Sequence, residues 1–237
     1  MTLRALVLAA LLAVLFVHAD ARHPEPVALT DIAAQGNMEN AREADDRCST
    51  GRTGYYWAIG DWFTGNEVYA SLGRPGTCAD CGGGWMAVSV TMFLYWPSAE
   101  QCELTAVGGI REAIPCGESY MPGPLIVASE PTTVGGYEKA GLWAVTVTMP
   151  ENTPILTGPF FATVEFLDAC GNLPKIVTDS GPCVVGQSWN DWGSDWQGLC
   201  DFSFPGDLSL YATLQCQGPT PVERNTWTTI KAIYRNP

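Results

Sequence analysis

Three tryptophans alternate with acidic and amide residues in one short polar stretch near the end of the chain, SWNDWGSDWQGL (188–199). The tryptophans are Trp189, Trp192 and Trp196. Exposed aromatic rings can stack on sugars, carboxylate and amide oxygens are ligands that calcium prefers, and Asn and Asp side chains stabilise turns by bonding to nearby backbone. The stretch therefore fits a sugar platform, a calcium site or a tight turn, and the turn is favoured.

A carbohydrate site would use flat aromatic side chains that face water. The candidates come from this stretch and from the first strand-like segments: Trp57, Trp62, Tyr69, Trp189, Trp192 and Trp196. The alternative is burial, because β-sandwich cores contain many large aromatic residues. Trp96 and Trp143 lie in strongly alternating segments, and we expect both in the core.

A calcium site would draw on neighbouring oxygen ligands. The candidates are Asn190, Asp191 and Asp195, joined by Asp61 and Glu67. Their spacing does not match the EF-hand loop. Calcium is thus a possible ligand, with turn formation as the alternative role, and no other cofactor is expected.

Catalysis by a serine or cysteine nucleophile is disfavoured, because such a nucleophile usually needs a histidine base. The two histidines are His18 and His23, both before the predicted domain. The remaining enzymatic possibility is glycoside hydrolysis by a pair of carboxylates, for which Glu67, Glu165, Asp191 and Asp195 are candidates. No catalytic residue is assigned, and a non-catalytic role is favoured.

The chain has nine cysteines, which in an exported protein predict a disulfide framework. The Cys78-x-x-Cys81 pair lacks the second pair or the histidines that a zinc site needs, and no helix follows it to lower a thiol pKa. Proximity in sequence suggests the pairs Cys102–Cys116, Cys170–Cys183 and Cys200–Cys216, although spacing cannot fix connectivity. One cysteine must stay unpaired or bond to another chain.

The chain is strongly acidic, with a formal net charge of −13. This charge repels nucleic-acid phosphates and anionic membrane surfaces. Calcium, cationic partners and neutral carbohydrate remain compatible with it. Nucleic acid is therefore excluded as a partner, whereas a glycan or a cell-surface protein is possible.

Period-two alternation of apolar and polar residues predicts several strands. In residues 85–96, one face would hold Met86, Val88, Val90, Met92, Leu94 and Trp96. Similar alternation covers residues 142–149, 160–167 and 208–216, and weaker strands are expected at 104–110, 125–128, 175–178 and 183–186. Many short strands joined by Gly- and Pro-rich turns predict an all-β fold, an antiparallel β-sandwich and possibly a jelly roll.

The chain divides into four segments. Residues 1–21 have the three parts of a secretory signal peptide: Arg4, an apolar run and a small-residue cleavage site. A polar linker (22–50), a β-sandwich domain (51–217) and a Pro-rich linker with a tail (218–237) follow, and the tail is a possible sorting segment. We expect no membrane span and a secreted or cell-surface location, with the periplasm as an alternative.

Several motifs occur together in an order that resembles an uncharacterised exported domain of environmental bacteria. The resemblance covers about residues 52 to 235 and rests on YYWAIGDWFTGNEVYA, CADCGGGWMAVSVTMFLYWP, GLWAVTVTMP, GPFFATVEF, WNDWGSDWQGL, FSFPGDLSLYATLQC and the terminal TPVERNTWTTIKAIYR. It implies a surface or secreted β-sandwich of bacterial origin and supplies no catalytic residue.

These observations predict an exported, disulfide-bonded β-sandwich that serves as a binding or surface-structural module. Its ligand is not fixed by the sequence, and carbohydrate is one possibility. The sequence does not predict an oligomeric state. The alternative function is that of a carboxylate-pair glycoside hydrolase.

Overall fold

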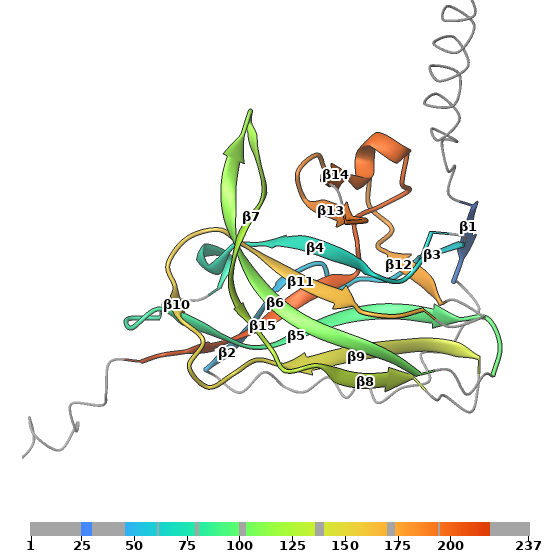
Figure 1. Ribbon diagram of the computed structural model, residues 1–237. Coiled ribbons are helices and arrows are strands. Elements are labelled where there is room, and N and C mark those ends of the chain that lie inside the picture. The colour runs from blue at the N-terminus through green and yellow to red at the C-terminus, as the bar shows by residue number, and fades with distance from the viewer. Residues whose placement is uncertain are drawn as a thin grey trace, which may run out of the picture.

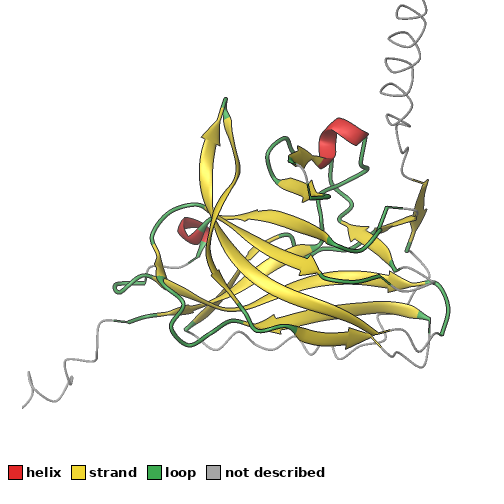
Figure 2. Cartoon of the chain, viewed as in Figure 1, coloured by secondary structure: helices red, strands yellow, loops and turns green. Residues whose placement is uncertain are grey.

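The computed structural model describes residues 25–29, 46–60, 62–78, 81–99, 103–135, 140–169, 174–193 and 195–218. Within these ranges the regular secondary structure is β-strand apart from two short 3₁₀ turns, and loops join the strands (Figure 2). The elements are β1 (Glu25–Ala28), β2 (Arg47–Gly51), β3 (Trp57–Gly60), β4 (Glu67–Gly73), η1 (Pro75–Thr77), β5 (Trp85–Trp96), β6 (Glu103–Cys116), β7 (Ser119–Ala128), β8 (Thr132–Gly135), β9 (Gly141–Thr148), β10 (Ile155–Leu156), β11 (Phe160–Phe166), β12 (Lys175–Thr178), β13 (Ser188–Asp191), β14 (Trp196–Gly198), η2 (Leu199–Phe202) and β15 (Leu210–Cys216).

The strands form two antiparallel sheets that pack as a β-sandwich, which confirms the predicted fold class. The eight-stranded sheet has the order β1-β3-β12-β5-β15-β2, and β9 and β10 also pair with β5. The seven-stranded sheet has the order β14-β13-β4-β11-β6-β7, and β8 also pairs with β6. The far end of the β6–β7 hairpin and the β13–β14–η2 segment both project on the same side of the sandwich (Figure 1).

The core lies between the sheets, where alternate residues of each strand meet. The seven-stranded sheet contributes Phe160, Ala162, Val164 and Phe166 from β11, and Leu208, Leu210, Ala212 and Leu214 face them from the segment that includes β15. These are the faces that the alternation predicted. The side chains of Trp62 and Tyr69 are also fully buried here, so the prediction that they stack on sugar is wrong.

One face of β5 differs from the prediction. Val90, Met92, Leu94 and Trp96 do enter the core, but Met86 and Val88 do not, and Trp85 and Ala87 take their place. The pairing with β15 shifts register between Thr213, opposite Ser89, and Leu214, opposite Ala87. This β-bulge adds one residue to β5 and reverses the facing of every residue before it.

Three disulfides fix the described part of the fold: Cys48–Cys78, Cys81–Cys216 and Cys183–Cys200. All three predicted pairings are wrong, because Cys116 is a free, exposed thiol and the other described cysteines have different partners. The sheet explains the error: β5 pairs with β15, which places Trp85 opposite Cys216 and brings residues far apart in sequence together. Cys102 and Cys170 lie outside the described residues.

Some predicted boundaries also differ. β1 and all but the last residue of β2 lie in the segment 22–50 that was expected to be a polar linker, and both strands belong to the eight-stranded sheet. The weak strand expected at 183–186 is a loop that ends in a turn. The predicted signal peptide and most of the tail lie outside the described residues.

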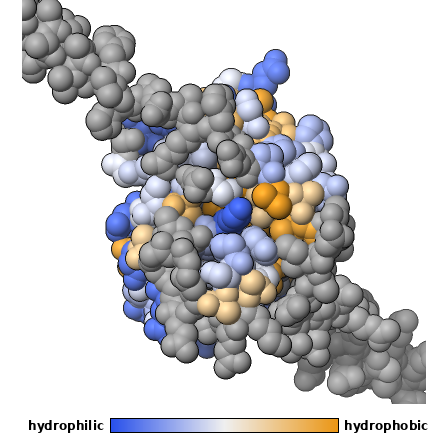
Figure 3. Space-filling model, turned by 90° about the vertical axis from the view of Figure 1, so that its right-hand side faces the viewer, coloured by the Kyte–Doolittle hydropathy of each residue, from blue (hydrophilic) through white to orange (hydrophobic). Residues whose placement is uncertain are grey.

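In the end-on view of Figure 3, hydrophobic residues form separate patches among hydrophilic ones.

Candidate functional site

The outer face of the seven-stranded sheet carries an aromatic cluster of its own. Because side chains alternate along a strand, the residues between the core positions of β4, β11 and β13 point away from the core. Three of them are buried, Ala70, Leu72 and Phe161. They are covered by the half-buried side chains of Ala113, Tyr120, Trp189 and Trp196. An antiparallel sheet that faces water on one side is normally polar on that side, so this outer aromatic face (Ala70, Leu72, Ala113, Tyr120, Phe161, Trp189 and Trp196) is the candidate site.

Two arginines extend the outer aromatic face. The guanidinium carbon of Arg111 lies 5.3 Å from the ring centre of Trp196, and that of Arg74 lies 5.9 Å from the ring centre of Tyr120. A cation over an aromatic ring is attracted by the negative charge of the ring face. Arg111 also donates a hydrogen bond of 3.2 Å from Nη1 to the carbonyl oxygen of Gly123. Both cations are therefore held at the sheet surface.

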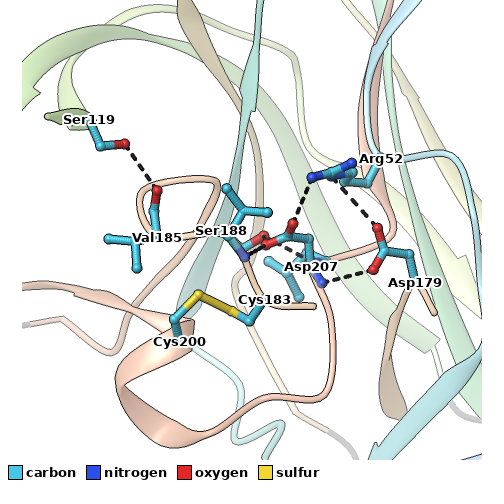
Figure 4. The surroundings of a disulfide bond; sticks show 10 residues. Arg52, Ser119, Asp179, Cys183, Val185, Ser188, Cys200 and Asp207 are labelled. Carbon is cyan, nitrogen blue, oxygen red and sulfur yellow. Dashed lines mark hydrogen bonds and ion pairs between the residues drawn. A yellow bond between two sulfur atoms is a disulfide. The ribbon is translucent and has the colours of Figure 1, made fainter. Parts of the chain in front are cut away.

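A buried carboxylate fixes the segment that carries Trp189 and Trp196. Asp207 is fully buried, and its Oδ1 accepts hydrogen bonds of 3.2 Å from the backbone N–H of Val184 and from the hydroxyl of Ser188, the residue before Trp189. Its Oδ2 accepts a hydrogen bond of 2.9 Å from Nη2 of Arg52 (Figure 4). Burial raises the pKa of Asp207, against the lowering effect of these donors.

The neighbouring residues complete this support. Oδ1 of Asp179 accepts hydrogen bonds from the backbone N–H groups of Asp207 (3.1 Å) and Gly181 (3.0 Å). The Cys183–Cys200 disulfide lies beside Asp207 and closes the loop that contains β13 and β14 (Figure 4). Among the described residues, Cys183, Cys200 and Asp207 are also the only group of three possible metal ligands of these types. Both sulfurs are in the disulfide, so this group offers no thiolate to a metal.

The β6–β7 hairpin touches the same loop. The hydroxyl of Ser119, at the turn of the hairpin, donates a hydrogen bond of 3.1 Å to the carbonyl oxygen of Val185. Gly186 has a positive φ of 80°, and a Cβ at this position would overlap the Ser119 hydroxyl. Only glycine permits both this backbone conformation and this close approach. The two segments that carry Tyr120 and Trp189 are thus held together at this point.

The structure divides the six aromatic candidates for carbohydrate binding. Trp189 and Trp196 lie on the outer aromatic face. Trp192 instead caps the core, with its ring centre 5.2 Å from that of Trp62 and 5.7 Å from that of Phe202. Trp57 is half-buried on β3, in the other sheet, against Tyr56. The predicted set therefore does not form one surface.

The calcium candidates are also separated. Glu67 and Asn190 are buried: Glu67 accepts hydrogen bonds from the backbone N–H groups of Thr64 (2.8 Å) and Gly65 (3.2 Å), and Nδ2 of Asn190 donates to the carbonyl oxygen of Val68 (3.1 Å). Burial raises the pKa of Glu67.

The remaining calcium candidates lie elsewhere. Oδ1 of Asp191 accepts a hydrogen bond of 2.7 Å from the backbone N–H of Gly193, which is the expected Asx turn. Asp195 is exposed, and Asp61 lies outside the described residues. The turn interpretation is thus supported at Asp191, and calcium binding stays a prediction.

Two carboxylates from the catalytic set share the outer face. Val68 of β4 pairs with Glu165 of β11 on one side and with Asp191 of β13 on the other. Glu165 and Asp191 alternate with core-facing neighbours, so both point outward with Val68 between them. Glu67 belongs to the opposite, inner side and is buried.

Sequence reasoning missed Arg74, Arg111, Tyr120 and Phe161. The alternation in residues 160–167 predicts Phe161 on the face opposite the core residues, and a large apolar residue there is a signal of a covered outer face. Arg111 lies one residue beyond the strand expected at 104–110, in an acidic chain with few basic residues, which is a weaker signal. The contacts of Arg74 and Tyr120 join segments far apart in sequence and left no local pattern.

The fold and the site define a disulfide-bonded β-sandwich with an aromatic and arginine-bearing outer sheet face. The chain belongs to the family described as Domain of unknown function (DUF7451), whose sequence profile matches residues 63–213. That range contains every residue of the outer aromatic face. No protein with a curated description matches the chain.

A comparison with solved structures finds similarity to the crystal structure of the cysteine protease and lectin-like domains of Cwp84, a surface layer associated protein of Clostridium difficile. The TM-score is 0.44 and the sequence identity is 10%, over 73% of this chain and 37% of that chain. The chain thus spans little more than a third of the length of the protein it matches.

Proposed function

We propose that the chain is an exported, non-catalytic carbohydrate-binding module whose ligand lies on the outer aromatic face. The observation that carries the proposal is the pair of half-buried tryptophans, Trp189 and Trp196, on a sheet face that would otherwise be polar. Both rings keep some exposed surface that a ligand could contact, and the Arg111 guanidinium over the Trp196 ring would be part of the same contact surface. Tryptophan and tyrosine are enriched at binding surfaces because they combine apolar area with a polar group.

The support described above favours a pre-organised site. Trp189 follows Ser188, which is bonded to the buried Asp207, and both tryptophans lie inside the loop that the Cys183–Cys200 disulfide closes. A rigid platform loses little conformational entropy when a ligand binds, so a larger part of the contact energy appears as affinity.

Export is supported by the disulfides. Disulfides are typical of secreted, periplasmic and cell-surface proteins and are rare in reducing compartments. Within the described part of the chain, no helix has the length and apolar character needed to cross a membrane. The expected signal peptide at residues 1–21 is consistent with secretion or display at the surface.

The proposal is tested by binding of the full chain to a glycan array, followed by calorimetry with the best ligand. We expect Trp189→Ala and Trp196→Ala each to weaken binding at least tenfold, since central aromatic residues typically contribute about 2 kcal/mol or more to binding. Trp57→Ala is the matched control, because Trp57 is also a half-buried tryptophan but lies on the other sheet. No binding to any glycan, or equal losses in all three variants, would contradict the proposal and leave a surface-structural role.

A second candidate function, glycoside hydrolysis, is favoured by one observation. Glu165 and Asp191 face outward on either side of Val68, two strand spacings apart, which is about 10 Å between backbones. The carboxyl groups of inverting glycosidases are about 6.5–9.5 Å apart. Release of reducing ends from a bound glycan, lost in Glu165→Gln and Asp191→Asn but kept in the control Glu112→Gln, would establish hydrolysis. Binding without product release would rule it out for that glycan.

A further inference from the structure

We propose that the ligand of the outer aromatic face is an acidic polysaccharide, and that Arg111 and Arg74 bind its carboxylate groups. This inference rests on the proposed function and adds the chemical class of the ligand. It also identifies two residues that would distinguish that ligand from neutral glycans.

The first argument is the pairing of the basic residues. Among the described residues, both ion pairs are made by Arg52, with Asp179 and Asp207. Arg111 and Arg74 lie instead over the rings of Trp196 and Tyr120. In a chain with a net charge of −13, two arginines without a described carboxylate partner on one sheet face are unexpected. Their positions are those expected for cations that bind an anion from outside the chain.

The second argument is geometric. A guanidinium group over an aromatic ring keeps N–H donors at its edge, and two of these donors can bind the two oxygens of a carboxylate in parallel. The Nε of Arg111 is buried and has no acceptor among the described residues, and the same is true of Nε1 of Trp189. Buried N–H groups normally have an acceptor. Both atoms are closed to solvent, so direct contacts to a ligand would come from the other N–H groups of Arg111 and from the exposed guanidinium group of Arg74.

The third argument is the arrangement of charge along the face. Arg111 pairs with Phe161 on β11, and Arg74 directly follows the end of β4, so both arginines lie at one end of the strands. Glu165 lies four residues further along β11, about 13 Å away. A sugar chain laid along the strands would meet the arginines at one end and carboxylates, which accept hydrogen bonds from hydroxyl groups, at the other.

The negative charge of the whole chain opposes an anionic ligand only at long range. At physiological ionic strength, charges further apart than about 8 Å are largely screened. Direct contacts between a guanidinium group and a carboxylate are shorter than this, so they persist. Binding should therefore be measured at about 0.15 M salt, where the local contacts dominate.

The test uses two forms of one polymer, polygalacturonate and its fully methyl-esterified form, which differ only in whether the carboxylates are free. We expect the full chain to bind the free acid at least tenfold more tightly than the ester, since a hydrogen bond to a charged group typically contributes about 1.5–3 kcal/mol. Arg111→Gln and Arg74→Gln should each reduce this preference. Arg74 and the control Arg47 are both exposed, so neither Arg74→Gln nor Arg47→Gln should disturb folding, and Arg47 lies on the other sheet.

The outcomes separate this inference from the proposed function. A preference for the acid that both arginine variants lose and Arg47→Gln keeps would support the inference. Equal binding of acid and ester, or a preference that the arginine variants do not change, would overturn it and leave carbohydrate binding intact. Tighter binding of a sulfated polymer, dextran sulfate, than of polygalacturonate would overturn the assignment to carboxylates. Failure to bind these polymers or any other glycan would overturn both proposals.

Discussion

Removal of the Cys183–Cys200 disulfide should lower the affinity for the ligand more than removal of another disulfide that contributes more to stability. The bond closes a loop with a sequence separation of 17 residues, and this loop contains Trp189 and Trp196. Loss of the restriction on the unfolded chain costs about 3 kcal/mol for a loop of this length. The Cys183→Ser/Cys200→Ser variant should lose about that much free energy of unfolding.

The Cys81–Cys216 disulfide provides the comparison. It has a sequence separation of 135 residues and joins the turn before β5 to the end of β15, in the other sheet. The same relation gives about 5 kcal/mol for its removal. Its loss should therefore destabilise the chain more than loss of Cys183–Cys200, yet leave the outer aromatic face in place.

Urea unfolding followed by tryptophan fluorescence would measure both stabilities, and calorimetry with the glycan found on the array would measure both affinities under conditions where each variant is folded. We expect the larger loss of affinity in Cys183→Ser/Cys200→Ser and the larger loss of stability in Cys81→Ser/Cys216→Ser. If the first variant loses stability but binds as tightly as the natural chain, the disulfide does not position the site. If its stability changes by less than about 1 kcal/mol, the loop-closure reasoning is wrong.

Three further predictions concern single positions. Burial raises the pKa of Glu67, so this carboxyl group stabilises the folded state more as the pH falls from 7 toward its ordinary pKa. Glu67→Gln should therefore reduce the dependence of the unfolding free energy on pH, measured by urea unfolding. If that dependence is unchanged, the pKa of Glu67 is not raised in the folded chain. Gly186→Ala should lower the free energy of unfolding by at least about 1–2 kcal/mol because of the positive φ, and further because the new Cβ would overlap the Ser119 hydroxyl. Adding Ser119→Gly should relieve the overlap only. If the double variant regains the full stability of the natural chain, the positive φ contributes nothing. Cys116 is exposed and free, so a maleimide reagent should label it in the folded chain, as peptide mass analysis would show; labelling at Cys183 or Cys200 instead would refute the disulfide assignment.

The sequence predicted the fold class well because alternation is a local property. The core faces of β9, β11 and β15 follow directly from period-two patterns, and a sandwich is the ordinary way to bury them. β5 shows the limit of this reasoning. Its bulge depends on pairing with β15, a strand far away in sequence, so no local pattern marks the point at which the facing reverses.

The site was only half predictable for the same reason. The three tryptophans of the 188–199 stretch looked equivalent, yet Trp192 turns to the core whereas Trp189 and Trp196 face outward. Tyr69 looked like a surface aromatic, although its side chain is fully buried and packs against the rings of Phe63 and Phe166. The predicted disulfide pairs are wrong because sheet pairing, and not proximity in sequence, decides which cysteines meet.

The central claim is that ligand binds at Trp189 and Trp196, and nuclear magnetic resonance tests it most directly. Each tryptophan indole N–H gives its own signal in a ¹⁵N-labelled chain, and single Trp→Phe variants assign the signals. Titration with the glycan identified on the array should shift the signals of Trp189 and Trp196 and leave those of Trp57 and the buried Trp62 unchanged. Shifts centred on Trp57, or no indole shift at a saturating glycan concentration, would contradict the claim.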